Sequence, residues 1–288
     1  MAFSKGNEST EGAPIVRYTG VASVFVRGVN FNKAELEKFF ERDIENEPVY
    51  VGESDNNGVK VPQVRLDFMV EADKEKYGID FKSRVTLFLR RMPRVSKAGK
   101  KQVIDKYGRT AWATEEEIAS KSIPVYSNGK PANIDKDYRV AYSGEEDLIN
   151  FLIAYLNIPS PQRYVNGEWV MNEASKLPDS EAMLEHIEDY FKGDFKEIKT
   201  IVSYQPNNKV KVLFGVRTAD DGKQYQTCYT RMFLKNSVND YSRLDKNLQD
   251  TKASGALSSS EFDVNELHEY KVEATDFTEE APSSTPWD

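Results

Sequence analysis

Cationic and aromatic side chains gather in one segment of this chain, between Lys82 and Trp112. From Lys82 to Arg109 the sequence carries ten basic residues and a single acid, Asp105. Cations neutralise phosphates and flat rings stack on bases, which is what sequence-tolerant binding of a single nucleic-acid strand requires. If about five phosphates are neutralised, the log–log dependence of affinity on salt has a slope of roughly −3.5. The candidate contact residues in this segment are Lys82, Arg84, Phe88, Arg90, Arg91, Arg94, Lys97, Lys100, Lys101, Lys106, Tyr107, Arg109 and Trp112.

A second candidate set follows the same logic further along the chain. One predicted strand brings basic residues to one face, and the next brings rings and an arginine to one face. Apolar neighbours at Cys228, Met232 and Leu234 leave open which way those rings point. For both sets the alternative is that the cations are the solvated side of half-buried strands and the rings belong to the core. The residues of the second set are Lys209, Lys211, Arg217, Tyr225, Tyr229, Arg231 and Phe233.

The formal net charge of −8 is unevenly distributed. Nine acids and only Lys271 lie between Glu261 and Asp288, so the rest of the chain holds 38 acidic and 38 basic residues. An acidic tail of this kind either serves as a solubilising terminus or presents aromatic anchors to a partner protein. The candidate partner-binding residues are Phe277, Glu279, Glu280, Trp287 and Asp288.

Several kinds of chemistry are not indicated. Two histidines and one cysteine cannot build a structural Cys/His zinc site, and Ala98-Gly99-Lys100-Lys101 lacks the features of a phosphate-binding loop. We therefore predict no cofactor, no metal and no catalytic residue. The longest apolar run, Ile149 to Ile158, is too short to cross a membrane, and the N-terminus lacks an apolar leader. With a single cysteine, these features favour the cytoplasm.

Alternating strands are predicted over 15–29, 62–70, 82–92, 196–205, 209–218 and 224–234, with a hairpin over 102–113. Asn32 is expected to cap a helix over 33–42, and Ser143 with Glu146 has capping-box spacing ahead of a second helix. The predicted fold class is α+β: an OB-fold-like β-barrel over 14–250 with a helical insertion at about 114–195. Residues 1–13 are expected to form a disordered arm, and 251–288 a linker, a possible last strand and the disordered acidic tail.

Two short stretches of sequence accompany these predicted elements. They are Tyr107-Gly108-Arg109-Thr110-Ala111-Trp112-Ala113 and Tyr142-Ser143-Gly144-Glu145-Glu146-Asp147-Leu148. With its basic strands and acidic tail, the chain resembles the single-stranded DNA-binding proteins of tailed bacteriophages, most nearly those of crAss-like phages. The resemblance implies protection of exposed DNA during replication and recombination, with the tail contacting other replication proteins. The chain departs from the family in ending Trp287-Asp288 rather than in phenylalanine.

Three functions remain open at this point. The first is non-enzymatic binding of single-stranded DNA, with RNA as a possible ligand. The second is a phage virion or assembly component whose basic segment meets an acidic partner surface. The third is a metal-dependent nuclease, because carboxylates are abundant.

Overall fold

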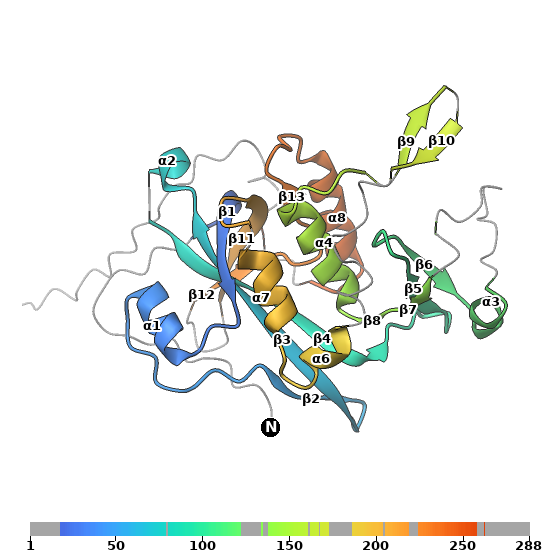
Figure 1. Cartoon of the computed structure of the whole chain (residues 1–288), viewed down its shortest axis with the longest axis horizontal. Coiled ribbons are helices and arrows are strands. Elements are labelled where there is room, and N and C mark those ends of the chain that lie inside the picture. Colours follow the sequence, from blue (N-terminus) through green and yellow to red (C-terminus); the bar gives the residue numbers. More distant parts are fainter. Residues whose placement is uncertain are drawn as a thin grey trace, which may run out of the picture.

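The fold is α+β and is built on an antiparallel sheet that curls into half a barrel (Figure 1). The structure is a computed structural model. The structure describes residues 18–78, 80–121, 134, 138–160, 162–166, 168–172, 186–203, 205–218, 224–257 and 262. The arm predicted for residues 1–13, the last strand predicted near 268–277 and the acidic tail lie outside these residues.

The main sheet contains eight strands in the described part of the chain. Its neighbours run in the order β12-β11-β1-β3-β4-β8, while β13 also pairs with β11 and β2 with β3. The bounds are β1 (Gly20–Val29), β2 (Val51–Asn56), β3 (Val59–Ala72), β4 (Lys82–Pro93), β8 (Tyr142–Ser143), β11 (Lys209–Thr218), β12 (Gln224–Cys228) and β13 (Leu234–Lys235).

Strict alternation in β3 and β4 gives this sheet an apolar inner face. Val85, Leu87 and Leu89 are fully or nearly fully buried, whereas the residues between them in β4 point to the other face. The register pairs Leu66 with Leu87, so the two strands present their apolar side chains to the same core. Alternation therefore fixes which residues of β4 remain on the outer face.

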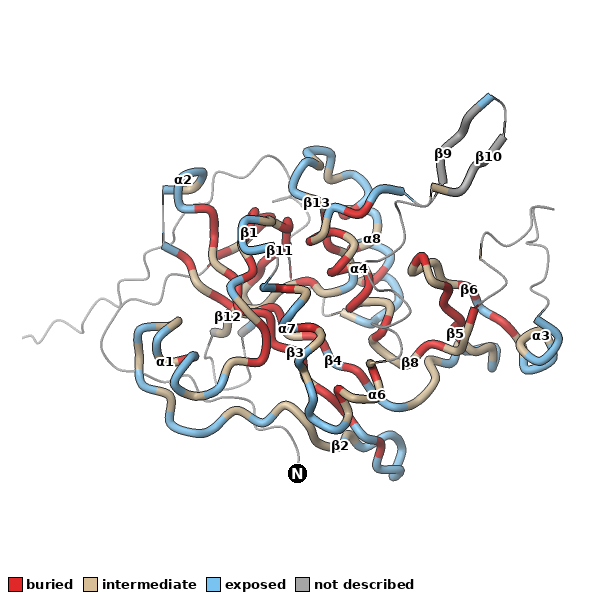
Figure 2. Tube along the Cα trace, viewed as in Figure 1, coloured by how far each residue is buried: buried red, intermediate tan, exposed pale blue. Residues whose placement is uncertain are grey.

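In the described part of the chain, three helices cover the inner face: α4 (Glu145–Tyr155), α6 (Ile187–Tyr190) and α7 (Lys196–Ser203). The rings of Phe68 in β3 and Phe151 in α4 lie 4.3 Å apart at the centre of this core. Buried residues follow the central strands and recur along α4 (Figure 2). The core thus lies between one face of the sheet and these helices.

The strand predicted over 196–205 is wrong, because most of this segment forms helix α7. Ile198 and Val202 are buried and Ile201 packs against the same core, which is the i, i+3, i+4 spacing of a helix face. The β-branched side chains of this segment suggested a strand, and tertiary packing of one helical stripe determines the outcome instead.

A smaller three-stranded sheet lies beside the start of α4 (Figure 1). It consists of β5 (Lys101–Ile104), β6 (Thr110–Ala113) and β7 (Arg139–Val140), and α3 (Glu115–Ala119) follows β6. A separate hairpin of β9 (Gln162–Val165) and β10 (Glu168–Met171) also falls in the stretch predicted to be a helical insertion. That stretch therefore contains strands as well as helices.

The outer face of the main sheet is covered at two places. Helix α8 (Ser242–Ala253) packs over Val21 in β1 and Leu213 in β11. Phe31 packs directly on Gly28, where a Cβ atom would lie 2.1 Å from the ring, and α1 (Lys33–Phe40) follows it. The capping box predicted at Asn32 is confirmed. A short helix, α2 (Lys74–Tyr77), lies in the connection between β3 and β4.

Strand β12, at one edge of the main sheet, approaches β4 near the opposite edge. At the end of β12, the Cys228 thiol contacts the backbone of Thr86 in β4 and packs against the main core. Burial raises the pKa of this thiol to about 12, and the Thr86 backbone only partly offsets that effect. Cys228 therefore serves as a small packing residue.

Candidate nucleic-acid interface

Two aromatic rings are well exposed among the side chains that the structure describes, and both lie in the segment predicted to bind. Phe88 on β4 is 41% exposed and Trp112 on β6 is 38% exposed. Each lies on a strand whose neighbouring residues point into a core, so alternation places the ring on the solvent side. These rings offer faces on which bases could stack.

Arginines surround Phe88 on the outer face of the sheet. The β3–β4 register places Arg65 directly across from Phe88, and Arg84 and Arg90 lie on the same face of β4. Arg90 is exposed and lies across from Gln63, which is buried. A ring flanked by guanidinium groups combines a stacking surface with phosphate-binding donors.

A buried carboxylate fixes part of this arrangement. Asp67 accepts a hydrogen bond from the Thr86 hydroxyl at 2.8 Å, and its carboxylate lies 2.9 Å from the Arg65 guanidinium. Arg84 approaches the same carboxylate at 3.7 Å. Asp67 therefore holds the two arginines in place and cancels one of their two charges.

Trp112 has a different partner. The Arg94 guanidinium lies over its ring at 5.7 Å, and Gln102 faces it across the β5–β6 hairpin. Arg94 also pairs with Glu146 of α4 at 2.6 Å. The hairpin and the start of α4 are thus joined through Arg94.

Acids from distant parts of the sequence neutralise most of the local positive charge. Among the residues that the structure describes, at least six of the ten basic residues between Lys82 and Arg109 form ion pairs, and five of these six partners lie outside that segment. The pairs are Lys82 with Glu41, Arg84 with Asp67, Arg91 with Glu188, Arg94 with Glu146, Lys101 with Glu115 and Arg109 with Asp105. Hydrogen bonding to Glu41 raises the pKa of Lys82. The charge excess of the fold is therefore smaller than the sequence count indicates.

Three cations of the segment remain without an ion-pair partner within the described part of the chain. They are Arg90, Lys97 and Lys100, and the first two are exposed. Lys106 lies over the Tyr107 ring at 5.6 Å. The phosphate-binding capacity suggested by the sequence is reduced accordingly.

The expectation that Tyr107 offers a stacking face is corrected by the structure. Its ring is 4% exposed, because the turn that carries it folds around the buried Asp105 carboxylate. That carboxylate accepts hydrogen bonds from the backbone amides of Tyr107 and Arg109 and pairs with the Arg109 side chain at 2.6 Å. Tyr107 and Arg109 therefore stabilise the turn around Asp105.

Most of the second candidate set is also structural. Tyr229 and Phe233 are buried. Tyr229 lies beneath α8, where its hydroxyl donates to the Asn247 side chain and also lies 2.7 Å from the Thr251 hydroxyl. Tyr225 is half-buried, whereas Arg217 and Arg231 are exposed. None of the three rings of this second set is therefore exposed as Phe88 and Trp112 are.

The lysines of β11 are held by neighbouring groups. Lys209 pairs with Asp73 at 2.6 Å, and its ammonium lies 4.7 Å from the centre of the Phe25 ring. Lys211 is 2% exposed and donates to the Asn239 side chain at 2.9 Å and to the Val238 carbonyl. Burial, followed by the nearby charge of Lys76, lowers the pKa of Lys211. Neither ammonium is available in the way that the sequence suggested.

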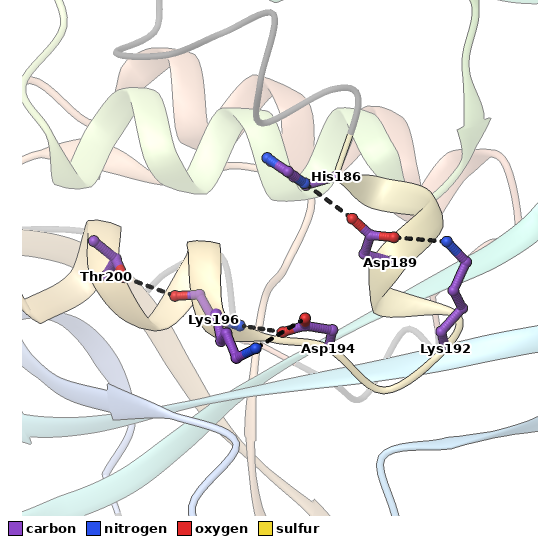
Figure 3. A network of polar contacts seen from close by, with 6 residues as sticks. All are labelled: His186, Asp189, Lys192, Asp194, Lys196 and Thr200. Carbon is purple, nitrogen blue, oxygen red and sulfur yellow. Dashed lines mark hydrogen bonds and ion pairs between the residues drawn. The ribbon is translucent and has the colours of Figure 1, made fainter.

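A surface network around α6 and α7 accounts for the one histidine that the structure describes (Figure 3). His186 lies 3.0 Å from the Asp189 carboxylate, which also binds the Lys192 ammonium at 2.7 Å. Hydrogen bonds from His186 and Lys192 lower the pKa of Asp189. The network is a cluster of partly exposed side chains at the end of a helix, and it gives His186 a structural partner.

Sequence reasoning missed two residues of this surface. Arg65 is not among the candidates, and its position across from Phe88 follows only from the β3–β4 register. Glu146 was interpreted as a helix-capping residue, but it binds Gln102 and Thr110 of the neighbouring sheet and Arg94 in the segment between β4 and β5. The tail residues Phe277, Glu279, Glu280, Trp287 and Asp288 lie outside the described residues.

Within the described residues, no cluster of three or more His, Cys, Asp or Glu side chains is arranged to hold a metal ion. None of the helices described here is long and apolar enough to cross a membrane. Comparison with known proteins found no matching family model, no matching curated protein and no matching solved structure.

Proposed function

We propose that this chain is a non-enzymatic protein that binds single-stranded nucleic acid, in the first place single-stranded DNA. The outer face of β4 and the β5–β6 hairpin would form the contact surface. The observation that carries the proposal is that Phe88 and Trp112, the two well-exposed aromatic rings of the described chain, both lie there beside arginines.

We also propose that the curled sheet is an OB-type barrel. The support is the strand order: β1, β3 and β4 form a meander, α4 follows β4, and β11 and β12 return beside β1. In OB-folds, oligonucleotides bind to the face of the second and third strands. The corresponding strands here are β3 and β4, whose outer face carries Arg65, Phe88 and Arg90.

Binding on this surface would use stacking and charge together. Bases would stack on Phe88 and Trp112, each worth about 1–3 kcal/mol. Phosphates would be neutralised by cations that lack an ion-pair partner within the described chain: Arg90, Lys97 and Lys100. Neither interaction reads base identity, so affinity should depend little on sequence.

The test is the binding of a fluorescein-labelled oligo-dT, followed by anisotropy, against a duplex of the same length. We expect saturable binding of the single strand and much weaker binding of the duplex, because paired bases are not free to stack on the two rings. Equal affinity for both forms would show that only phosphate charge is recognised. Absence of binding at low salt would end the proposal.

The acidic tail would then act as a docking segment for other replication proteins and as a competitor for cations. Deleting residues 278–288 is expected to tighten oligo-dT binding, because the tail carries like charge to the DNA. Pull-down of replication proteins should be lost in the same variant. If neither property changes, the tail is only a solubilising terminus.

A further inference from the structure

The Glu146 carboxylate is held by donors that would suit a phosphate group. Its Oε2 atom accepts hydrogen bonds from the Arg94 guanidinium at 2.6 Å and from the Gln102 amide at 2.8 Å. Its Oε1 atom accepts one from the Thr110 hydroxyl at 3.0 Å. A guanidinium, an amide and a hydroxyl converging on one anion are typical of phosphate contacts in nucleic-acid interfaces.

These three donors belong to one small unit, whereas the carboxylate comes from another. Gln102 and Thr110 lie on the paired strands β5 and β6, and the backbone amide of Gln102 donates to the Arg94 carbonyl at 2.9 Å. Glu146 is in the first turn of α4. The donors would therefore keep their arrangement if the carboxylate left.

The anion position is open to solvent and lies beside an exposed ring. The side chains of Arg94 and Glu146 are 35% and 28% exposed, so the ion pair is of the partly solvated kind that contributes little net stability. The Arg94 guanidinium also lies over the Trp112 ring. A phosphate in place of the carboxylate would bring the attached nucleotide next to that ring.

One further group points to a ligand. Gln102 is 3% exposed, and its amide oxygen has no hydrogen-bond partner in the described part of the chain. Buried acceptors of this kind are rarely left unsatisfied. A base N–H group of the bound nucleotide, such as the thymine N3–H of oligo-dT, would satisfy it.

We propose that Glu146 occupies a phosphate-binding position formed by Arg94, Gln102 and Thr110, and that a backbone phosphate of the bound strand displaces it. This inference rests on the proposed function, and it makes the Glu146 carboxylate a competitor of the nucleic-acid phosphate for the same donors. The displaced carboxylate becomes solvated and gathers a counterion of its own. The wild-type protein therefore gains less from this contact than the donor set would otherwise provide.

The test is Glu146→Gln, with Glu188→Gln as the matched control. Both substitutions remove one negative charge from an ion pair with an arginine. Glu188 lies on α6 and pairs with Arg91 of β4, outside the proposed position. Binding of inorganic phosphate is measured by calorimetry, and oligo-dT binding is measured at several salt concentrations. We expect E146Q to bind phosphate more tightly than E188Q, and its oligo-dT slope to become steeper by about 0.7 because one more phosphate contact releases a counterion.

The two parts of the experiment separate the two proposals. If E146Q binds phosphate no better than E188Q, the phosphate position is refuted, while the oligo-dT affinity of the wild-type protein still decides the proposed function. If E146Q binds phosphate but its oligo-dT slope equals that of E188Q, the assignment to a nucleic-acid backbone is refuted. Should E146Q fail to fold, phosphate titration of the wild-type protein, followed by the NMR signal of the Arg94 Nε–H group, decides the question: an unchanged signal contradicts displacement.

Discussion

Replacing Phe88 with alanine should weaken binding of a single strand far more than it weakens the fold. Base stacking on one ring is worth about 1–3 kcal/mol, which corresponds to about 5- to 150-fold in Kd. Because the Phe88 side chain is 41% exposed, its truncation should cost about 1–2 kcal/mol of stability, less than the ~3–5 kcal/mol typical of a fully buried phenylalanine.

The assay is anisotropy of labelled oligo-dT, combined with chemical unfolding of each variant. Val59→Ala is the matched control, since Val59 is also an exposed strand residue, 62% exposed, but lies at the far end of β3, in the hairpin with β2. Phe88→Trp retains a flat ring and should keep most of the affinity. If Phe88→Ala binds as tightly as Val59→Ala, the reasoning about the outer face of β4 is refuted.

Two further predictions, which use three substitutions, test the framework around this surface. Gly144→Ala should destabilise the protein by about 3 kcal/mol or more, because Gly144 has a φ of +90° and a Cβ atom there would lie 1.8 Å from the Phe88 carbonyl oxygen. Gly58→Ala, also at positive φ but with no atom within 4 Å, should cost only about 1 kcal/mol; equal losses in urea unfolding would contradict the close contact. Burial, together with the neighbouring charge of Glu146, raises the pKa of Asp147 to about 6, so its ionisation opposes folding as pH rises from 4 through 6. Asp147→Asn should therefore be about 1–2 kcal/mol more stable than the wild type at pH 7.5 and equal to it near pH 4; lower stability at pH 7.5 would show that the charged form is favoured.

Local patterns predicted those parts of the fold that local chemistry determines. The alternation in β3 and β4 and the Asn32 cap each depend on a few neighbouring residues, and the structure has both. The start of α4 was not predictable in this way. Its N-cap is Gly144 rather than Ser143, and at Gly144 the backbone of β4 approaches too closely for a side chain.

The candidate site was only partly predictable for a related reason. Phe88 and Trp112 were candidate stacking rings, with burial in the core as the alternative, and both are exposed. The local charge excess was misleading, since a count over a window ignores partners such as Glu41 and Glu188 that only the tertiary fold brings close. Register and ion pairing across the fold depend on long-range contacts that the sequence alone does not define.

The salt dependence of oligo-dT binding by the intact chain tests the central claim most directly. With three cations lacking ion-pair partners in the described chain, Arg90, Lys97 and Lys100, the log–log slope should be about −2, shallower than the roughly −3.5 expected from the sequence. Affinity should remain measurable at high salt, because stacking on the two rings does not depend on counterions. Undetectable binding at the lowest salt concentration would contradict the account.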